Sequence, residues 1–183
     1  TVSGSGTIAL TNQLSGMTSA SVPLLDHTKM PVGSVVQQVS YQNAAHATST
    51  VLMPYDATIP QITEGAEFLS LSITPKNASN ILFIQVSLQV NTTQNAGWGF
   101  ATALFVGTTA NAIAAVGTVS QPNYLAPMQL NHRVVAGTTN ALTFRVRAGG
   151  QHTSGTTNFN GVEGYHKHGG VSASIITITE IKG

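Results

Sequence analysis

The chain has 183 residues, enough for one domain with a sizeable core, and its formal net charge is only +1. Charged residues make up 7% of it, against roughly 25% in a typical soluble domain, and no basic stripe or arginine cluster of the kind that binds nucleic acid is present. There is no cysteine, which excludes disulfides, thiolate metal sites and cysteine catalysis, and no apolar run of about 18 residues that would predict membrane insertion.

The first thirty residues differ in composition from the rest. "TVSGSGTIALTNQLSGMTSASVPLLDHTKM" is rich in Ser, Thr and Gly, so it cannot fill a core on its own. It is either a flexible linker or the extended end of a fibrous stalk that neighbouring chains stabilise. Because it opens without methionine, we expect the chain to be a piece of a longer polypeptide. The turn-like "MPVG" at 30–33 places the boundary between this segment, 1–30, and a β-domain, 31–183.

From residue 34 onward, apolar and polar residues alternate with a period of two, which is typical of half-buried strands. The stretch 99–107 is apolar throughout and predicts a strand covered on both faces. The stretch 111–119 could be a helix, but its length and its flanking Asn and Gly favour a strand. The predicted strands are 34–41, 68–75, 81–91, 99–107, 111–119, 141–149 and 171–181.

The strands are separated by short segments rich in Gly, Asn and Thr, such as "TTQNAGWG" and "AGTTNA". Their spacing is that of an all-β sandwich or barrel, and no long amphipathic helix or βαβ unit is visible. The prediction is therefore an all-β protein: an antiparallel β-sandwich of jelly-roll character with about eight to ten strands.

Three stretches carry a resemblance to a known family: "MPVGSVVQQVSYQ", "PYDATIPQITEGAEFLSLSITPKNASNILFIQV" and "SASIITITEI". Together they resemble the C-terminal domain of phage and prophage tail-fibre or structural proteins, over most of residues 30 to 182. The resemblance implies a virion component without enzymatic activity, which is a homotrimer that presents a compact β-domain at the tip of a fibre. The low charge suits a chain whose stability includes subunit interfaces, although a monomeric sandwich remains an alternative.

Within this hypothesis, the role of the domain is host-surface attachment, and its partners are other phage tail or capsid proteins and a host polysaccharide. A capsid decoration or head-fibre protein has the same composition and is the alternative function. The third hypothesis is a carbohydrate-active enzyme that uses Glu64, Glu67 or Glu163. Glu64 and Glu67 are close enough in sequence for a paired-carboxylate glycosidase site to be conceivable. For Glu64 and Glu67, a turn before the strand at Phe68 is the simpler interpretation, and Asp56 is expected to close a turn. No nucleophile elbow, P-loop or dinucleotide fingerprint is present.

Two of the six histidines are one residue apart, His166 and His168 in "GVEGYHKHGGV". In an extended strand these side chains point to the same side, and Lys167 points away. Three chains around a three-fold axis would then offer six imidazoles, which suits a transition metal and is similar to the His-x-His repeats of phage fibre tips. The alternative is an ordinary loop, and no cofactor is required. The other four are expected to be surface or packing side chains: His27, His46, His132 and His152.

Two predicted loops carry an aromatic ring beside amides, the usual equipment for stacking on a sugar and bonding its hydroxyls. They are Trp98 with Asn95, and Tyr124 with Asn123. Trp98 could instead plug the end of the sandwich or a subunit interface. Three arginines, Arg133, Arg145 and Arg147, could face an acidic glycan, but the last two share one strand face, where they could equally pair with Glu.

Overall fold

The computed structural model describes residues 27–93, 95–119 and 121–183. The chain divides into two units, Thr1–Met30 and Pro31–Gly183. The stalk or linker expected at 1–30 lies outside the described residues except for its last four, of which His27–Lys29 form a single 3-10 turn, η2. Every strand of the described residues belongs to the second unit.

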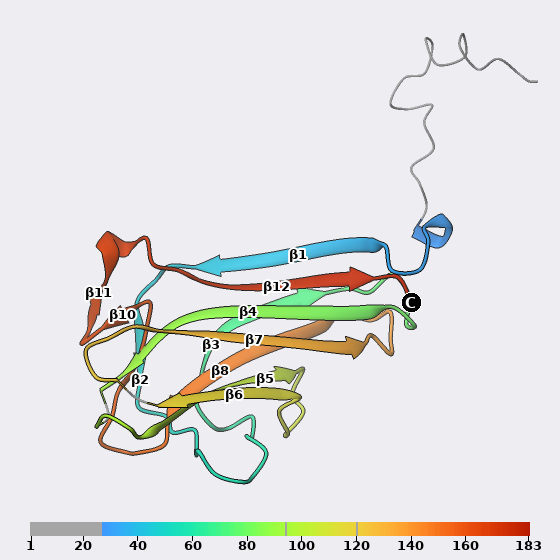
Figure 1. Ribbon diagram of the computed structural model, residues 1–183. Helices are drawn as coiled ribbons and strands as arrows, with labels where there is room; N and C mark the ends of the chain where they lie inside the picture. Colours follow the sequence, from blue (N-terminus) through green and yellow to red (C-terminus); the bar gives the residue numbers. More distant parts are fainter. Residues whose placement is uncertain (1–26, 94, 120) are drawn as a thin grey trace, which may run out of the picture. The chain divides into compact units, whose positions relative to one another are not determined.

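Eight longer strands of this unit form two sheets, and four short strands extend or join them (Figure 1). All strand pairs are antiparallel. The longer strands are β1 (Val35–Asn43), β3 (Ala66–Ile73), β4 (Ile81–Thr92), β5 (Gly99–Val106), β6 (Ala114–Val119), β7 (Ala126–Val135), β8 (Leu142–Gly150) and β12 (Ser174–Ile181). The short ones are β2 (Ala47–Ser49), β9 (Thr157–Phe159), β10 (Gly161–Val162) and β11 (Tyr165–His166), and a second 3-10 turn, η3, spans His168–Gly170.

The strand order identifies the architecture. One sheet has the order β1-β12-β4-β7, with β9 and β2 continuing from the far end of β4, and the other has the order β3-β8-β5-β6. The chain thus alternates between sheets by the connectivity of two Greek keys, which is the strand order of a jelly roll. The predicted fold class, an all-β sandwich of jelly-roll character, is confirmed.

The core lies between the two sheets and follows the alternation seen in the sequence. Leu82, Ile84, Val86, Leu88 and Val90 of β4 are all buried. Opposite them, β8 contributes buried side chains and β12 contributes Ile176 and Ile178 on the β4 side. Each such side chain contributes about 1.5–3 kcal/mol to stability on burial, so the buried rows of β4, β5, β8 and β12 contribute most to the closure of the sandwich.

The strand predicted to be covered on both faces, β5, is buried along nearly its whole length. Its inward side joins the main core, and its outward side packs against Met53 and Ile62 from the long connection between β2 and β3. This connection crosses the outer face of the second sheet, where the Met53 backbone N–H donates to Gly150 O at 3.0 Å. The outer face of this sheet is therefore partly covered by the domain itself.

One long strand was missed by sequence analysis. β7 pairs with β4 over ten residues, and Met128 and Leu130 face the core. Its pattern is obscured by Pro127 near its start and by His132 in the inward row. Pro127 is tolerated because β7 is an edge strand, so a missing N–H leaves no ladder partner unpaired on its free side.

The strands run between two opposite ends of the domain (Figure 1). We call proximal the end at which the chain enters β1 and leaves β12; it carries the connections 74–80, 107–113 and 136–141. We call distal the opposite end, with the connections 44–46, 95–98, 121–125 and 151–156, the β10–β11 hairpin and η3. At the proximal end the incoming and outgoing segments bond to each other, with Gly33 N donating to Lys182 O and Lys182 N to Ser34 O, both at 2.9 Å.

Candidate functional site

The distal end gathers the two predicted sugar-contact loops and the predicted histidine pair. Trp98 and Asn95 lie in the β4–β5 connection, Tyr124 and Asn123 in the β6–β7 connection, and His166 and His168 in or after the β10–β11 hairpin. Since these connections are distant in sequence, their meeting at one end results from the jelly-roll topology, which brings alternate turns to the same end.

Trp98 lies against His152 from the β8–β9 connection, with ring centroids 4.0 Å apart and planes tilted by 45°. The Trp98 N–H donates to Asn95 O at 3.3 Å and closes the turn, which leaves the Asn95 side chain exposed. Trp98 is half-buried, so part of its ring closes this corner of the sandwich and part remains accessible. The packing on His152 agrees with a plug at this corner, and a contact between Trp98 and a sugar stays a prediction.

The second aromatic loop lines a hollow of about 310 Å³ together with the segment after the hairpin. Tyr124 is 70% exposed, and Asn123 adopts a positive φ of 72° that turns the loop. Buried Asn91 holds the loop by donating from Nδ2 to Tyr124 O at 2.8 Å. The other walls are Leu125, Val162, Lys167 and His168, so the predicted sugar loop and part of the predicted metal motif form one hollow.

The histidine pair does not have the extended geometry assumed from the sequence. Only Tyr165 and His166 belong to a strand, whereas His168 has a φ of 52° and begins η3. Lys167 and His168 line the same hollow, and the ring of His166 instead lies 5.7 Å from that of His46. Within the described ranges, no three side chains of His, Asp or Glu are placed to hold one metal ion.

Tyr55 is a candidate contact residue that the sequence analysis missed. Its ring covers Gly99 of β5 and Gly117 of β6, where any added Cβ would collide with the ring, and it is still 56% exposed. Beside it, a hollow of about 170 Å³ is lined by Asp56 and Thr58, among others. The signal was present in "PYDATIP", where two prolines flank the aromatic ring, but only Asp56 was singled out.

Asp56 closes a turn, as predicted. Its Oδ1 accepts hydrogen bonds from Thr58 N at 2.7 Å and from Thr58 Oγ1 at 2.6 Å. These two bonds, that of the hydroxyl first, lower the pKa of the Asp56 carboxyl below its ordinary value. The carboxylate is thus held in place at the edge of the hollow beside Tyr55.

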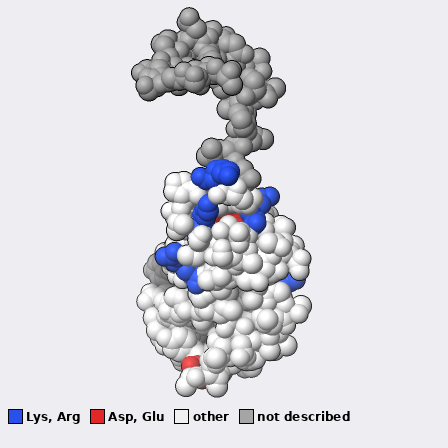
Figure 2. Space-filling model, turned by 90° about the vertical axis from the view of Figure 1, so that its right-hand side faces the viewer, with Lys and Arg blue, Asp and Glu red and all other residues white. Residues whose placement is uncertain are grey.

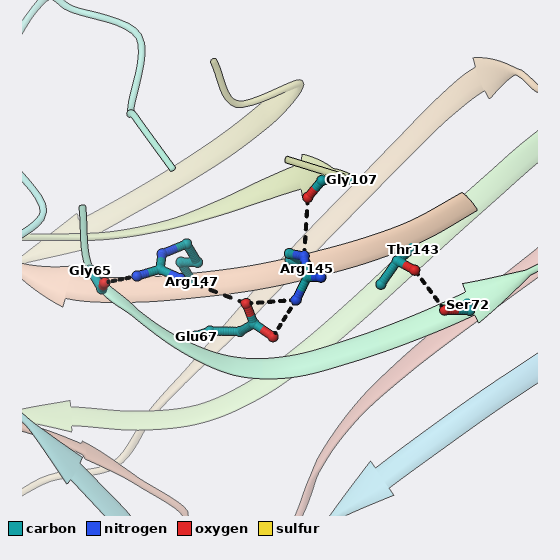
Figure 3. Close-up of polar contacts among 7 residues, drawn as sticks. All are labelled: Gly65, Glu67, Ser72, Gly107, Thr143, Arg145 and Arg147. Atoms are coloured by element: carbon teal, nitrogen blue, oxygen red, sulfur yellow. Dashed lines mark hydrogen bonds and ion pairs between the residues drawn. The ribbon is translucent and has the colours of Figure 1, made fainter. Parts of the chain in front are cut away.

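The charged side chains of β3 and β8 are paired on the outer face of the second sheet (Figure 3). Arg145 Nη1 lies 2.9 Å from Glu67 Oε1, and Arg147 Nη1 lies 3.7 Å from Glu67 Oε2. Arg147 also donates from Nε and Nη2 to the backbone carbonyls of Glu64 and Gly65. The expected pairing of these arginines with Glu is confirmed, and the three-arginine surface does not form, because Arg133 lies on β7 of the other sheet.

The structure also shows the surroundings of the three glutamates considered for a carbohydrate-active enzyme. Glu67 lies between the two arginines, and Glu64 Oε2 accepts the backbone N–H of Gln61 at 2.8 Å, within the turn before β3. Glu163 is exposed on the turn between β10 and β11, with a φ of 52°. Glu64 and Glu67 thus make contacts that build a turn and a sheet face.

Few charges appear on the surface as a whole. Figure 2 looks onto the proximal end, where most of the surface is neither basic nor acidic and the Lys and Arg side chains gather over one part. Lys76, Arg133 and Lys182 belong to this end. The hollow beside Tyr124 at the distal end and the hollow beside Tyr55 on the outer face of β5 and β6 are by contrast lined mainly by aromatic, hydroxyl, amide and aliphatic groups, with Asp56, Lys167 and His168 as their titratable members besides tyrosine. No helical segment of the described chain has the length and apolar character to span a bilayer.

Comparison with known proteins gives partial likenesses only. No protein family matches the chain, and no curated protein does. Among solved structures, dimeric latent PorU from Porphyromonas gingivalis aligns with a TM-score of 0.41 and 11% identity, over 83% of this chain and 14% of PorU. The VP2 subviral particle of infectious bursal disease virus aligns with a TM-score of 0.35 and 12% identity, over 81% of this chain and 38% of VP2. A selenomethionine-labelled α-amino acid ester hydrolase gives a TM-score of 0.32 and 10% identity, over 61% of this chain and 25% of the hydrolase. This chain thus spans well under half the length of these proteins, and the jelly-roll assignment rests on its own strand order.

Proposed function

We propose that this chain is a non-enzymatic virion structural protein of a phage, the tip domain of a tail fibre, which attaches to the host surface as a homotrimer. The observation that carries the proposal is the polarity of the domain. The chain enters and leaves the jelly roll at the proximal end, and the loops that expose Tyr124, Tyr165 and part of Trp98 lie at the distal end. A domain fixed at its proximal end would present those groups outward.

The exposed groups around Tyr124 at the distal end and around Tyr55 on the outer sheet face suit a glycan. Tyr55 and Tyr124 expose ring faces on which the C–H face of a sugar can stack, and amides and hydroxyls beside them can bond its hydroxyl groups. Loops on a rigid β-scaffold are the usual location of such contacts. Each site would bind weakly, and three tips per fibre would multiply the effect, since a second contact on one fibre forms at high effective concentration.

The outer face of the β1-β12-β4-β7 sheet supports the trimer. Near the proximal end, the register aligns one aliphatic residue from each strand: Val35, Ile181, Ile81 and Val135. Val35 and Val135 are 54% and 59% exposed, and Phe83 lines a shallow hollow beside this row with Arg133. Exposed apolar side chains of this kind are typical of surfaces that pack against another chain.

A capsid decoration or head-fibre protein is the second candidate, because the same polarity would serve a domain anchored on a shell. We do not propose a carbohydrate-active enzyme, since Glu67 is paired with two arginines and Glu64 bonds within its turn. A reconstruction of the particle would separate tail from capsid.

The test is binding of the purified protein to intact host cells and to their extracted surface polysaccharide, with the oligomer measured by light scattering. We expect a trimer that binds both, and loss of binding in the double variant Tyr55→Ala/Tyr124→Ala. The matched control is Ser70→Ala, an exposed residue of β3 on the other sheet, away from both the proposed trimer surface and the two hollows, which should bind as the parent does. An intact trimer that binds neither cells nor polysaccharide contradicts the proposed role.

A further inference from the structure

We propose that His46 and His166 together form a binding site for one divalent transition-metal ion within a single chain. The two rings come from the β1–β2 connection and from β11, with centroids 5.7 Å apart and planes at 63°. This site differs from the His166–His168 pair considered from the sequence, and it requires no three-fold axis. It does not depend on the proposed attachment function.

The first observation is an unpartnered nitrogen. Among the buried side-chain nitrogen and oxygen atoms of the described residues, His46 Nε2 alone has no hydrogen-bond partner. A buried polar atom without a partner costs about 1–3 kcal/mol, so native structures nearly always satisfy such atoms with protein, water or an ion. A metal ion bound at Nε2 satisfies that atom, because a neutral imidazole nitrogen is a good metal ligand.

The second observation is what surrounds this nitrogen. β10 and β11 pair so that Gly161 lies opposite His166, and a Cβ added at Gly161 would collide with His46 Cδ2, the ring carbon bonded to Nε2. The Nε2 edge of His46 therefore packs against the hairpin at the position from which His166 projects. Glycine at 161 is what allows the ring to approach the hairpin backbone so closely.

The backbone that carries His46 is fixed before any ion binds. Asn160, which is buried, donates from Nδ2 to Asn43 O at 2.8 Å and to Ala45 O at 3.1 Å. Its Oδ1 accepts from Ser174 Oγ of β12 at 2.8 Å, which ties the connection to the sheet. A ligand held in this way loses little conformational freedom on binding, so the site is preorganised on one side. His166 is exposed and can turn its ring toward the ion.

The separation of the rings agrees with shared coordination. Two imidazoles bound to one ion through metal–nitrogen bonds of about 2.0–2.1 Å have ring centroids about 5–6 Å apart. Imidazole nitrogen favours zinc, copper and nickel over magnesium or calcium. Since the described residues offer no third His, Asp or Glu ligand here, water fills the remaining positions and the affinity is that of a two-histidine site.

The experiment is titration of the untagged full chain with NiCl₂ and with ZnCl₂ in a non-coordinating buffer, followed by calorimetry. We expect one ion per chain. His46→Ala and His166→Ala should each weaken binding at least about tenfold, the lower end of the 10–100-fold loss seen when even an outer-shell partner of a metal is removed. The matched controls are His168→Ala and His152→Ala, histidines of the same distal end, and both should bind as the parent does. Parent-like binding by His46→Ala, or loss of binding in His168→Ala, overturns the proposal.

A second measurement does not rely on folding of the variants. Substoichiometric CuCl₂ broadens the proton resonances of any imidazole that binds it. In the parent protein, the His46 and His166 ring signals should disappear first, while the signals of His132 and His152 persist. Simultaneous broadening of all histidines, or broadening of His168 before His46, contradicts the assignment.

Discussion

Replacement of Glu180 should destabilise the domain more than any other single change to its acidic residues. Glu180 is fully buried near the proximal end of β12, and both of its carboxylate oxygens accept hydrogen bonds. Oε1 accepts from Lys76 N at 2.8 Å, from Asn77 N at 3.3 Å and from Asn80 Nδ2 at 2.6 Å. Oε2 accepts from Gln37 Nε2 at 2.5 Å. The carboxylate thereby joins β1, β12 and the β3–β4 connection.

The change Glu180→Gln keeps the shape and replaces one acceptor by a donor. If the remaining oxygen faces Lys76, Asn77 and Asn80, the new amide group meets Gln37 Nε2, which is also a donor. Gln37 cannot simply turn its amide over, because Nε2 also donates to Thr74 O at 2.8 Å. At least one hydrogen bond to a charged group is lost, so we expect the free energy of unfolding to fall by about 1.5–3 kcal/mol. Glu180→Ala removes every acceptor and should cost about 3–5 kcal/mol.

Urea unfolding followed by circular dichroism measures these changes, provided that the oligomer is kept at one concentration. The matched control is Glu67→Gln, which breaks a half-exposed ion pair and should cost no more than about 1 kcal/mol. A Glu180→Gln protein within about 0.5 kcal/mol of the parent would refute the view that this carboxylate organises the proximal end.

Two further predictions concern the loop that carries Tyr55. The pKa of Asp56, followed by carbon NMR, should lie below its ordinary value and rise in Thr58→Ala, because the hydroxyl bond that lowers it most is removed. The pKa of Asp56 is lower in the folded than in the unfolded protein. Any stability from this turn is therefore present above the ordinary pKa of aspartate and is lost as the pH falls through the lowered pKa of the folded state. A stability that rises as the pH falls through this range would contradict the role given to the Asp56 turn. Gly117→Val should leave the fold intact but displace the Tyr55 ring, since an added Cβ collides with it, and should weaken glycan binding as Tyr55→Ala does. An unchanged set of nuclear Overhauser contacts between Tyr55 and β6 in that variant would contradict the predicted displacement of the ring.

The alternation of apolar and polar residues was sufficient to predict most of the sandwich, because in a half-buried strand successive side chains point alternately to the core and to solvent. β4 alternates from Ile81 to Val90 and β8 from Thr143 to Ala148, and β5 was correctly predicted as covered on both sides. β7 was missed because His132 and Pro127 interrupt its pattern, although the histidine lies within the strand and the proline is harmless on an edge. β9 was missed because Asn158 and Thr157 are buried polar residues, whose burial depends on partners that composition does not reveal.

The candidate site was less predictable than the fold. The sequence identified Trp98, Tyr124 and the two histidines near the chain end one at a time, but their common location depends on which turns the topology brings together. The position of Tyr55 on the sheet surface was not predicted, because it depends on two glycines in β5 and β6 that lie far from Tyr55 in sequence. The pairing of His166 with His46 was likewise hidden, since the positive φ of His168 breaks the extended geometry that a period-two argument assumes.

The central claim is that the distal end faces outward and the proximal end faces the assembly. An electron cryo-microscopy reconstruction of the particle that carries this protein tests it directly. The account predicts three copies whose β1 and β12 termini, at Gly33 and Lys182, point toward the fibre shaft, with the Tyr55 and Tyr124 loops at the free surface. A reconstruction in which those loops are buried against the particle, with the proximal end exposed, would contradict it.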